Sequence, residues 1–123
     1  MERARKVRIA MSMALDRQGI KESLTEHQGE ECYLIQISTQ QAEWKDKWEM
    51  PYDPEKARSL LREAGYPNGF KAELWVGPGG FTVELGQAIA DLWLKNLNVE
   101  TTIDRITYTK LRPGLIRRDN TTI

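Results

Sequence analysis

Residues 71–104 change their hydrophobic period twice, and this change restricts the fold more than any other feature of the chain. Apolar and polar side chains alternate over 71–76, which is the pattern of a half-buried strand. Glycine and proline then interrupt the pattern, and 82–96 carries apolar side chains at the spacing of a helix. Alternation returns over 98–104. A strand, a helix and a second strand within about 35 residues predict a βαβ unit with parallel strands and a right-handed crossover.

The two faces of this unit follow from the same periods. The apolar stripe that we expect on the core side of its helix comprises Leu85, Ala88, Ile89 and Leu92, with Trp93 beside them. On the first strand, Ala72, Leu74 and Val76 share one face. Trp75 lies on the opposite face, toward either a second layer or a cleft. The glycine-rich loop at 77–80 lacks the spacing of a dinucleotide or P-loop motif, so we expect a structural turn there and no phosphate site.

A helix over 54–64 has the clearest ends in the sequence. Asp53 suits the N-cap, because its carboxylate can accept a hydrogen bond from a free backbone N–H. Pro54 suits the first helical position, where no N–H partner is lost, and Gly65 suits the left-handed residue that ends a helix. The apolar face of this helix comprises Ala57, Leu60, Leu61 and Ala64.

Apolar residues at three- and four-residue spacing also predict a helix over 4–15. Its apolar face comprises Val7, Ala10, Met11, Ala14 and Leu15. Ile9 and Met13 widen this face, so we expect the helix to be buried on two sides. Asp16 is then the predicted N-cap of a second, shorter helix, which carries Ile20 and Leu24.

Two segments are less regular. Residues 25–50 are expected to form an extended connection with at most one strand, at 32–37, where β-branched and aromatic residues gather. Residues 108–118 are predicted to be helical, with an interruption at Pro113. The whole chain, 1–123, is expected to be a single α/β domain in which one βαβ unit packs against three or four helices.

The residue types that catalysis and metal binding need are scarce. The 123 residues include one histidine, His27, and one cysteine, Cys32, which do not supply a zinc site. A single histidine also leaves the serines without the partner that a nucleophilic triad needs. The pair Glu30 and Glu31 has no apolar setting that would separate the two pKa values. We therefore predict no enzymatic activity, no metal and no cofactor.

The 18 basic and 18 acidic residues balance overall but are unevenly distributed. Five basic and two acidic residues lie in 1–20, and five basic and one acidic in 105–123, whereas nine acidic and three basic lie in 21–55. Basic ends around an acidic middle would suit a self-standing module that binds nucleic acid or an acidic protein, which stays open as the alternative function. No aromatic–basic motif of an RNA or DNA module accompanies these ends, so a solvated surface without nucleic acid is favoured.

The sequence also bears on membranes and export. No apolar run approaches the roughly 20 residues that a helix needs to cross a bilayer. The first residues, Met-Glu-Arg-Ala-Arg-Lys-Val-Arg, lack the apolar stretch of a secretory signal. We therefore expect no membrane span, and no signal peptide on this chain.

Several segments together resemble the family 5 extracellular solute-binding proteins, the peptide/nickel group that serves ABC importers. Residues 7–17, VRIAMSMALDR, resemble the VRxAxxxAxDR helix of that family. Residues 51–70, PYDPEKARSLLREAGYPNGF, are very similar to its YDPEKAxxLLxEAGYPxGF segment. The later stretches QAIADLWLKNLNVE and TYTKLRP resemble the region after that segment in the family, so the likeness spans about 5–118, whereas 25–50 match poorly.

Members of that family have several hundred residues in two lobes, which close on a peptide or another small solute. The resemblance implies that this chain is a fragment of the C-terminal lobe, with a periplasmic-binding-protein-like fold. It implies capture of peptides or similar small solutes for import, without catalysis. It also implies an ABC importer permease as partner and a periplasmic or extracellular location.

Four side chains are candidate ligand contacts: Trp48, Trp75, Tyr108 and Arg112. Burial in the core is the usual alternative for a tryptophan. Self-association is a separate expectation, because two parallel strands are too few to make a sheet that stands alone. Their outer edges would present unpaired N–H and C=O groups, so we expect a homodimer or larger assembly that forms through these edges.

Overall fold

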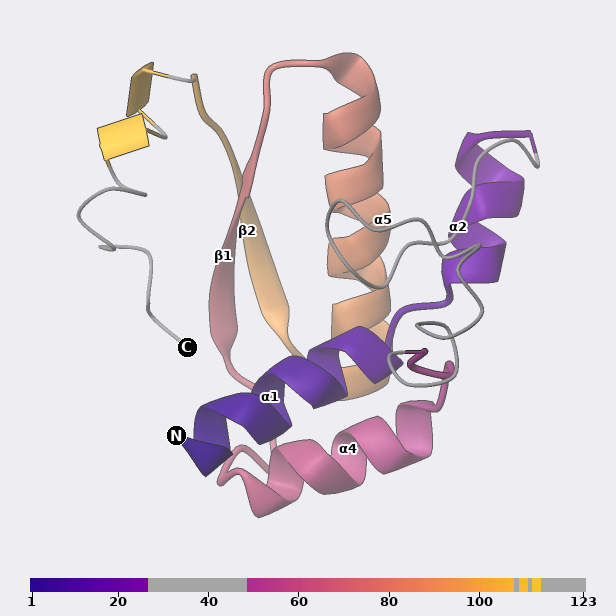
Figure 1. Ribbon diagram of the computed structural model, residues 1–123, viewed down its shortest axis with the longest axis vertical. Helices are drawn as coiled ribbons and strands as arrows, with labels where there is room; N and C mark the ends of the chain where they lie inside the picture. The colour runs from indigo at the N-terminus through magenta and orange to yellow at the C-terminus, as the bar shows by residue number, and fades with distance from the viewer. Residues whose placement is uncertain (27–48, 108, 111, 114–123) are drawn as a thin grey trace.

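The computed structural model describes residues 1–26, 49–107, 109–110 and 112–113. The elements along the chain are α1 (Glu2–Met13), α2 (Arg17–Leu24), α4 (Pro54–Glu63), β1 (Lys71–Val76), α5 (Gly80–Leu97) and β2 (Glu100–Arg105). In Figure 1 the two strands run beside α5, and α1 and α4 lie together beneath the C-terminal end of α5. This is the predicted α/β architecture, with one βαβ unit packed against further helices.

The two strands are parallel, as the sequence predicts, and are paired from Lys71↔Glu100 to Val76↔Arg105. β1 has the predicted bounds, but β2 begins at Glu100 and not at residue 98. The reason is that Asn98 ends α5 in the left-handed conformation, with φ 56°. Its Nδ2 donates to the carbonyl oxygen of Asn68 at 2.7 Å.

Gly69 makes this approach of two turns possible. Its φ is +78°, a conformation that side chains disfavour. A Cβ at this position would also overlap the carbonyl group of Asn98. The turn before β1 and the turn before β2 therefore touch backbone to backbone.

The face of α5 that is most buried differs from the predicted stripe. Leu85, Ala88, Ile89 and Leu92 are half-buried, and so is Trp93. The buried residues of the helix are Gly86, Ala90, Asn96 and Leu97. The helix is apolar on most of its circumference, so periodicity alone does not choose the side that packs on the sheet. The helix packs through its smallest residues, because these allow the closest approach of the helix to the sheet.

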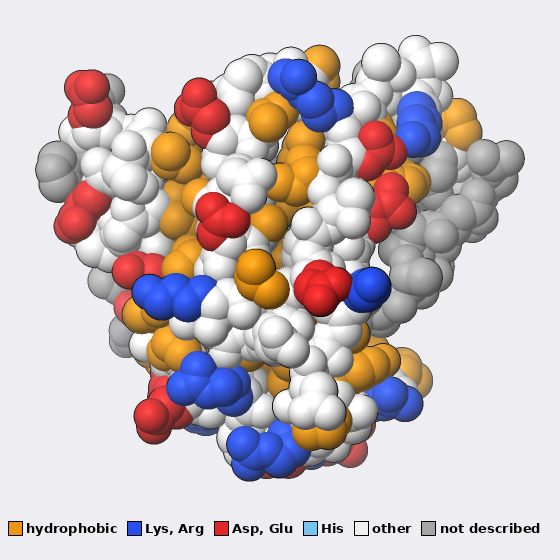
Figure 2. Space-filling view, turned by 180° about the vertical axis from the view of Figure 1, so that it is seen from behind, with side chains coloured by type: hydrophobic (Ala, Val, Ile, Leu, Met, Phe, Trp, Pro, Cys, Tyr) orange, Lys and Arg blue, Asp and Glu red, His pale blue; other side chains and the backbone are white. Residues whose placement is uncertain are grey.

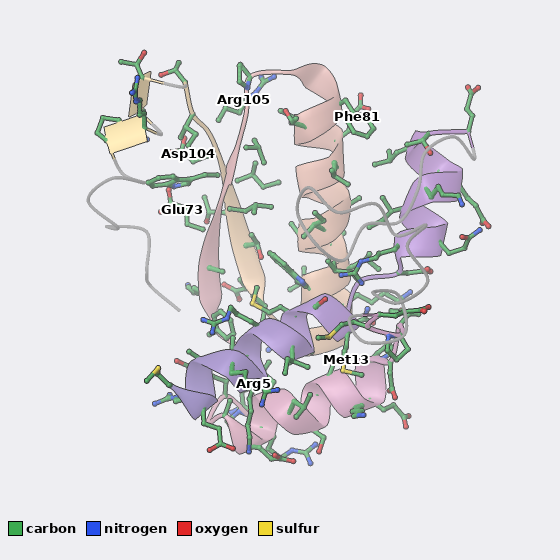
Figure 3. The ribbon with its side chains drawn as sticks, in the orientation of Figure 1. Arg5, Met13, Glu73, Phe81, Asp104 and Arg105 are labelled. Carbon is green, nitrogen blue, oxygen red and sulfur yellow. The ribbon has the colours of Figure 1, made fainter. Side chains whose placement is uncertain are left out.

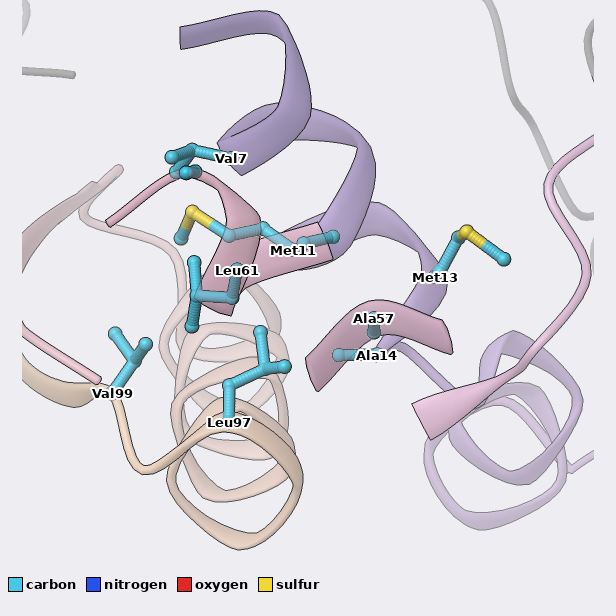
Figure 4. Close-up of a cluster of buried hydrophobic side chains, with 10 residues drawn as sticks. Val7, Met11, Met13, Ala14, Ala57, Leu61, Leu97 and Val99 are labelled. Atoms are coloured by element: carbon cyan, nitrogen blue, oxygen red, sulfur yellow. The ribbon is translucent and has the colours of Figure 1, made fainter. Parts of the chain in front are cut away.

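The main core lies where α1, α4, the end of α5 and the start of β2 meet (Figure 4). It comprises Val7, Ala10, Met11, Met13, Ala14, Ala57, Leu61, Ala64, Leu97 and Val99. The predicted apolar faces of α1 and α4 are thus confirmed, except that Leu15 and Leu60 are half-buried. Burial of Met13 and partial burial of Ile9 agree with the expectation that α1 is covered on two sides.

The predicted helix ends are present in the structure. Asp53 accepts a hydrogen bond from the N–H of Lys56 at 2.9 Å, and Asp16 accepts one from the N–H of Gly19 at 2.9 Å. Gly65 has φ +88° directly after α4. The predictions of these helix ends are thus confirmed. Each end depends on residues that are neighbours in sequence, which is why the sequence alone could predict it.

The C-terminal carbonyl groups of α1 are bonded by residues of two other elements. Trp93 donates from Nε1 to the oxygen of Met11 at 2.9 Å, and Asn96 donates from Nδ2 to the oxygen of Ala14 at 2.8 Å. The N–H of Asp53 donates to the oxygen of Met13 at 3.0 Å. These bonds tie α1 to α5 and to the start of α4.

Some predictions fall outside the described residues. These are most of the connection at 25–50, including its strand at 32–37, and most of the helix at 108–118. Of the latter, residues 109–110 and 112–113 are described and are helical. Within the described part of the chain, no helix combines the length and apolar character that crossing a membrane requires.

Gly86→Ala should destabilise the protein by about 1–3 kcal/mol, because the added methyl group has no room between α5 and the sheet. A Cβ at residue 86 would lie 2.7 Å from Cγ1 of Val76, whose β-branched side chain cannot swing away. Urea unfolding measures the change in the free energy of unfolding.

Gly80→Ala is the matched control, because nothing lies within 4 Å of a Cβ at that position in the same helix. This variant should unfold at the same urea concentration as the parent or slightly above it. Equal stability of the two variants would show that α5 does not pack on the sheet through Gly86.

Candidate functional site

The candidate site lies on the outer face of the sheet, which is the side turned away from α5. Val76 and Leu74 face α5, since both approach Gly86. Side chains alternate along a strand, so Glu73 and Trp75 point to the outer face. Trp75 pairs with Asp104 on β2, which places Asp104 on the outer face too. Figure 3 shows Glu73 and Asp104 on this side of the strands, away from α5.

Four side chains form what we term the indole–carboxylate cluster: Glu73, Trp75, Asp104 and Lys110. Trp75 donates from Nε1 to Oε1 of Glu73 at 2.6 Å. Lys110 donates from Nζ to Oδ2 of Asp104 at 2.7 Å. The Lys110 nitrogen also lies 5.9 Å from the centroid of the Trp75 ring, within the range of a cation–π contact. The cluster therefore joins both strands and the residues that come after β2.

The hydrogen bond from Lys110 to Asp104, together with the charge of that carboxylate, raises the pKa of Lys110 above its ordinary value. Lys110 is therefore protonated at neutral pH. The cluster then holds two carboxylates and one ammonium group. Its side chains remain open to water, with exposed fractions of 58% for Lys110 and 36% for Asp104.

The location of the cluster suits binding. Ligands of parallel α/β sheets bind beyond the carboxyl ends of the strands, and Trp75 and Asp104 are each next to last in their strands. A half-buried indole offers a flat apolar surface, and the carboxylates accept hydrogen bonds from an ammonium group. Among the residues described by the structure, no three His, Cys, Asp or Glu side chains are grouped as metal ligands.

Of the four predicted ligand contacts, the structure brings Trp75 into this cluster. Arg112 is described and exposed. Trp48 and Tyr108 lie outside the described residues. Sequence reasoning missed Glu73, Asp104 and Lys110. Alternation around Trp75 and the pairing of the strand ends could have revealed the first two, whereas the position of Lys110 depends on a turn that carries no comparable pattern.

A side-chain hydroxyl group forms hydrogen bonds within the glycine-rich loop before α5. Thr82 Oγ1 lies 2.9 Å from the carbonyl oxygen of Gly77 and 2.6 Å from that of Gly79. A hydroxyl group that donates to the loop's carbonyls stabilises a turn. This geometry agrees with the expectation of a structural turn at 77–80.

Comparison with known proteins gives a family match over nearly the whole chain. The model of the bacterial extracellular solute-binding proteins, family 5 Middle, matches residues 3–121. Heme-binding protein A of Haemophilus influenzae is 40% identical over 73 residues, which are 59% of this chain and 13% of that protein.

Solved structures agree with the family match. The protein AgaA from A. tumefaciens R10, in complex with agropinic acid, aligns with a TM-score of 0.75 at 25% identity over 94% of this chain. A dipeptide-binding protein from Pseudoalteromonas sp. SM9913, in complex with Met-Leu, aligns with a TM-score of 0.68 at 25% identity over 91% of it. The chain spans 24% and 23% of these two proteins, respectively. The predicted periplasmic-binding-protein-like fold is thus confirmed.

Asp104→Asn should lower the pKa of Lys110 toward its ordinary value, because the variant loses the carboxylate that accepts the bond and supplies the charge. NMR titration of the Lys110 side chain measures this pKa. Glu73→Gln should lower it less, since Glu73 contributes the weaker charge effect.

Glu100→Gln is the control, because Glu100 pairs with Lys71 at 3.5 Å, at the opposite end of the sheet. The pKa of Lys110 should not change in this variant. An unchanged pKa in Asp104→Asn would contradict the arrangement of the cluster.

Proposed function

Because the chain belongs to the bacterial extracellular solute-binding proteins of family 5, we propose that it serves in the capture of a peptide or a similar small solute for import. The capturing protein delivers its solute to the permease of an ABC importer, in the periplasm or outside the cell, and catalyses no reaction. The match over residues 3–121 is the single observation that carries this proposal.

The indole–carboxylate cluster is the proposed point of solute contact on this chain. A dipeptide such as Met-Leu, the ligand of one relative, has an ammonium group and apolar side chains. The carboxylates of Glu73 and Asp104 are suited to bind the ammonium group, and the Trp75 ring is suited to pack against the apolar side chains. Trp48, Tyr108 and Arg112 are proposed as further contacts, since two of them flank Lys110 in sequence.

The alternative, a self-standing module that binds nucleic acid or an acidic protein through its basic ends, has less support from the structure. Lys6 donates to Oε2 of Glu63 at 2.9 Å, and the guanidinium carbon of Arg3 lies 4.7 Å from the centroid of the Tyr66 ring. Arg17 donates to the hydroxyl oxygen of Ser12 at 2.8 Å. Several basic side chains of the N-terminal end thus bond within the protein.

Met-Leu should shift the backbone amide NMR signals of the outer face of the sheet at millimolar concentration. Calorimetry with a mixed pool of di- to pentapeptides should detect no binding tighter than about millimolar, or about −4 kcal/mol. The reason is that the cluster offers one wall, whereas tight binding of a small ligand buries most of its surface.

Trp75→Ala should abolish these shifts, whereas Phe81→Ala should retain them. Phe81 is the matched control because it is also an exposed aromatic residue, but it lies on α5 on the far side from the sheet (Figure 3). Micromolar peptide binding, or equal shifts in both variants, would contradict solute contact at the cluster as proposed.

Self-association through the strand edges is also proposed. The N–H groups of Glu100 and Ile106 donate to Phe70 and Val76 on the β1 side. The alternation of a parallel ladder then directs the N–H groups of Ile103 and Arg105 to the open edge of β2. In the described part of the chain no third strand covers this edge.

Light scattering at tens of micromolar should report a dimer or a larger species, because this edge can pair with a second copy. Arg105→Pro should shift the protein toward the monomer by removing an outward N–H group while the ladder to β1 stays intact. Ile103→Lys should act in the same direction, but it also disturbs packing, so circular dichroism must show that the variant is folded. A monomeric parent protein would overturn the proposal.

A further inference from the structure

A second polar site lies at the other end of the βαβ unit, between the C-terminal ends of α4 and α5. The pocket there has a volume of about 250 Å³ and nine lining residues, which come from α4, the turn after it and the end of α5. Three of the nine are basic, namely Arg58, Arg62 and Lys95, and none is acidic. In Figure 2, several basic side chains lie on the lower part of the molecule, and Figure 1 shows that α5 ends above α4 in this part.

These three cations have no acidic partner in the described part of the chain. The ion pairs found there join Lys6 to Glu63, Lys71 to Glu100 and Lys110 to Asp104. Arg58, Arg62 and Lys95 take part in none of them. The pocket therefore carries three cationic side chains, none of which forms an ion pair with a carboxylate of the described residues.

The negative C-terminal ends of the two helix dipoles offset a part of the positive charge of the pocket. Each helix C-terminus is equivalent to about half a negative charge, so the ends of α4 and α5 together supply about one. Their carbonyl groups are also largely bonded already. For example, Leu94 accepts from the N–H of Asn98, Leu61 accepts from the N–H of Tyr66, and Asn96 accepts from Arg58 at 3.1 Å. About two positive charges remain in excess.

The pocket is held in place by neighbouring contacts. Arg58 is fixed by its bond to the carbonyl oxygen of Asn96, which leaves the other N–H groups of its guanidinium free to bind a ligand. Asn96 is in turn held by Ala14 and by the hydroxyl of Tyr52, at 2.8 and 3.3 Å. The guanidinium of Arg58 is thus already oriented, so this side chain loses little entropy when it binds an anion.

We propose that this pocket binds a small oxyanion with two negative charges, such as inorganic phosphate or sulfate. Two excess positive charges match a dianion, and the guanidinium groups of Arg58 and Arg62 match the geometry of tetrahedral oxygens. A lipid headgroup offers the same phosphate chemistry, but as a diester with one charge. The free dianion is therefore the ligand to which the proposal commits.

The test is a titration of the whole chain with sodium sulfate and with inorganic phosphate, followed by backbone amide NMR at constant ionic strength. Both anions should saturate with a Kd below about 10 mM and shift the signals of the C-terminal turns of α4 and α5. Chloride, which has one charge and no oxygen acceptors, should cause no saturable shift. Vesicles of phosphatidylglycerol should not be bound.

Arg62→Gln and Lys95→Gln should each weaken sulfate binding by about tenfold, because each removes one charge-assisted hydrogen bond. Arg58 is not substituted in this test, because its bond to Asn96 also stabilises the end of α5. Lys56→Gln is the matched control, an exposed lysine of α4 that does not line the pocket, and it should leave the Kd unchanged. No saturation by 50 mM sulfate, an equal response to chloride, vesicle binding, or a Kd that neither pocket variant changes would overturn the proposal.

Discussion

The hydrogen bonds at the C-terminal end of α1 hold the described elements together. A helix leaves its last carbonyl groups without partners, and burying them unbonded is costly. Here Trp93 and Asn96, both from α5, bond two of these groups, and the backbone N–H at the start of α4 bonds a third. Three elements are thereby fixed around the C-terminal end of α1. The apolar core beside this end includes Leu61 and Val99.

A parallel strand pair needs a long crossover, and that requirement determines where polar chemistry can lie. α5 covers one face of the sheet, so Glu73, Trp75 and Asp104 gather on the other. The same helix ends above α4, where its C-terminus and that of α4 meet the basic pocket. The proposed solute contact and the proposed anion site are thus at opposite ends of the βαβ unit.

Sequence predicted the features that depend on neighbours in the chain. The cap at Asp53, the left-handed Gly65 and the bounds of β1 follow from local chemistry, and all are present. The buried face of α5 does not follow from local chemistry, because it depends on how closely Gly86 approaches a strand residue that lies ten residues earlier in the sequence. The cluster partners of Trp75 and the meeting of Arg62 with Lys95 likewise depend on tertiary packing, for which a single sequence has no periodic signal.

The bonds from α5 to α1 also limit which changes of length the chain can tolerate during evolution. One residue added to or removed from α5 would rotate everything beyond that point by about 100°. Trp93 and Asn96 would then leave the end of α1, although the added residue itself could sit on an exposed turn. Insertions should therefore accumulate in the glycine-rich loop ahead of the helix, while the distance from Gly86 to Asn98 stays constant among related chains.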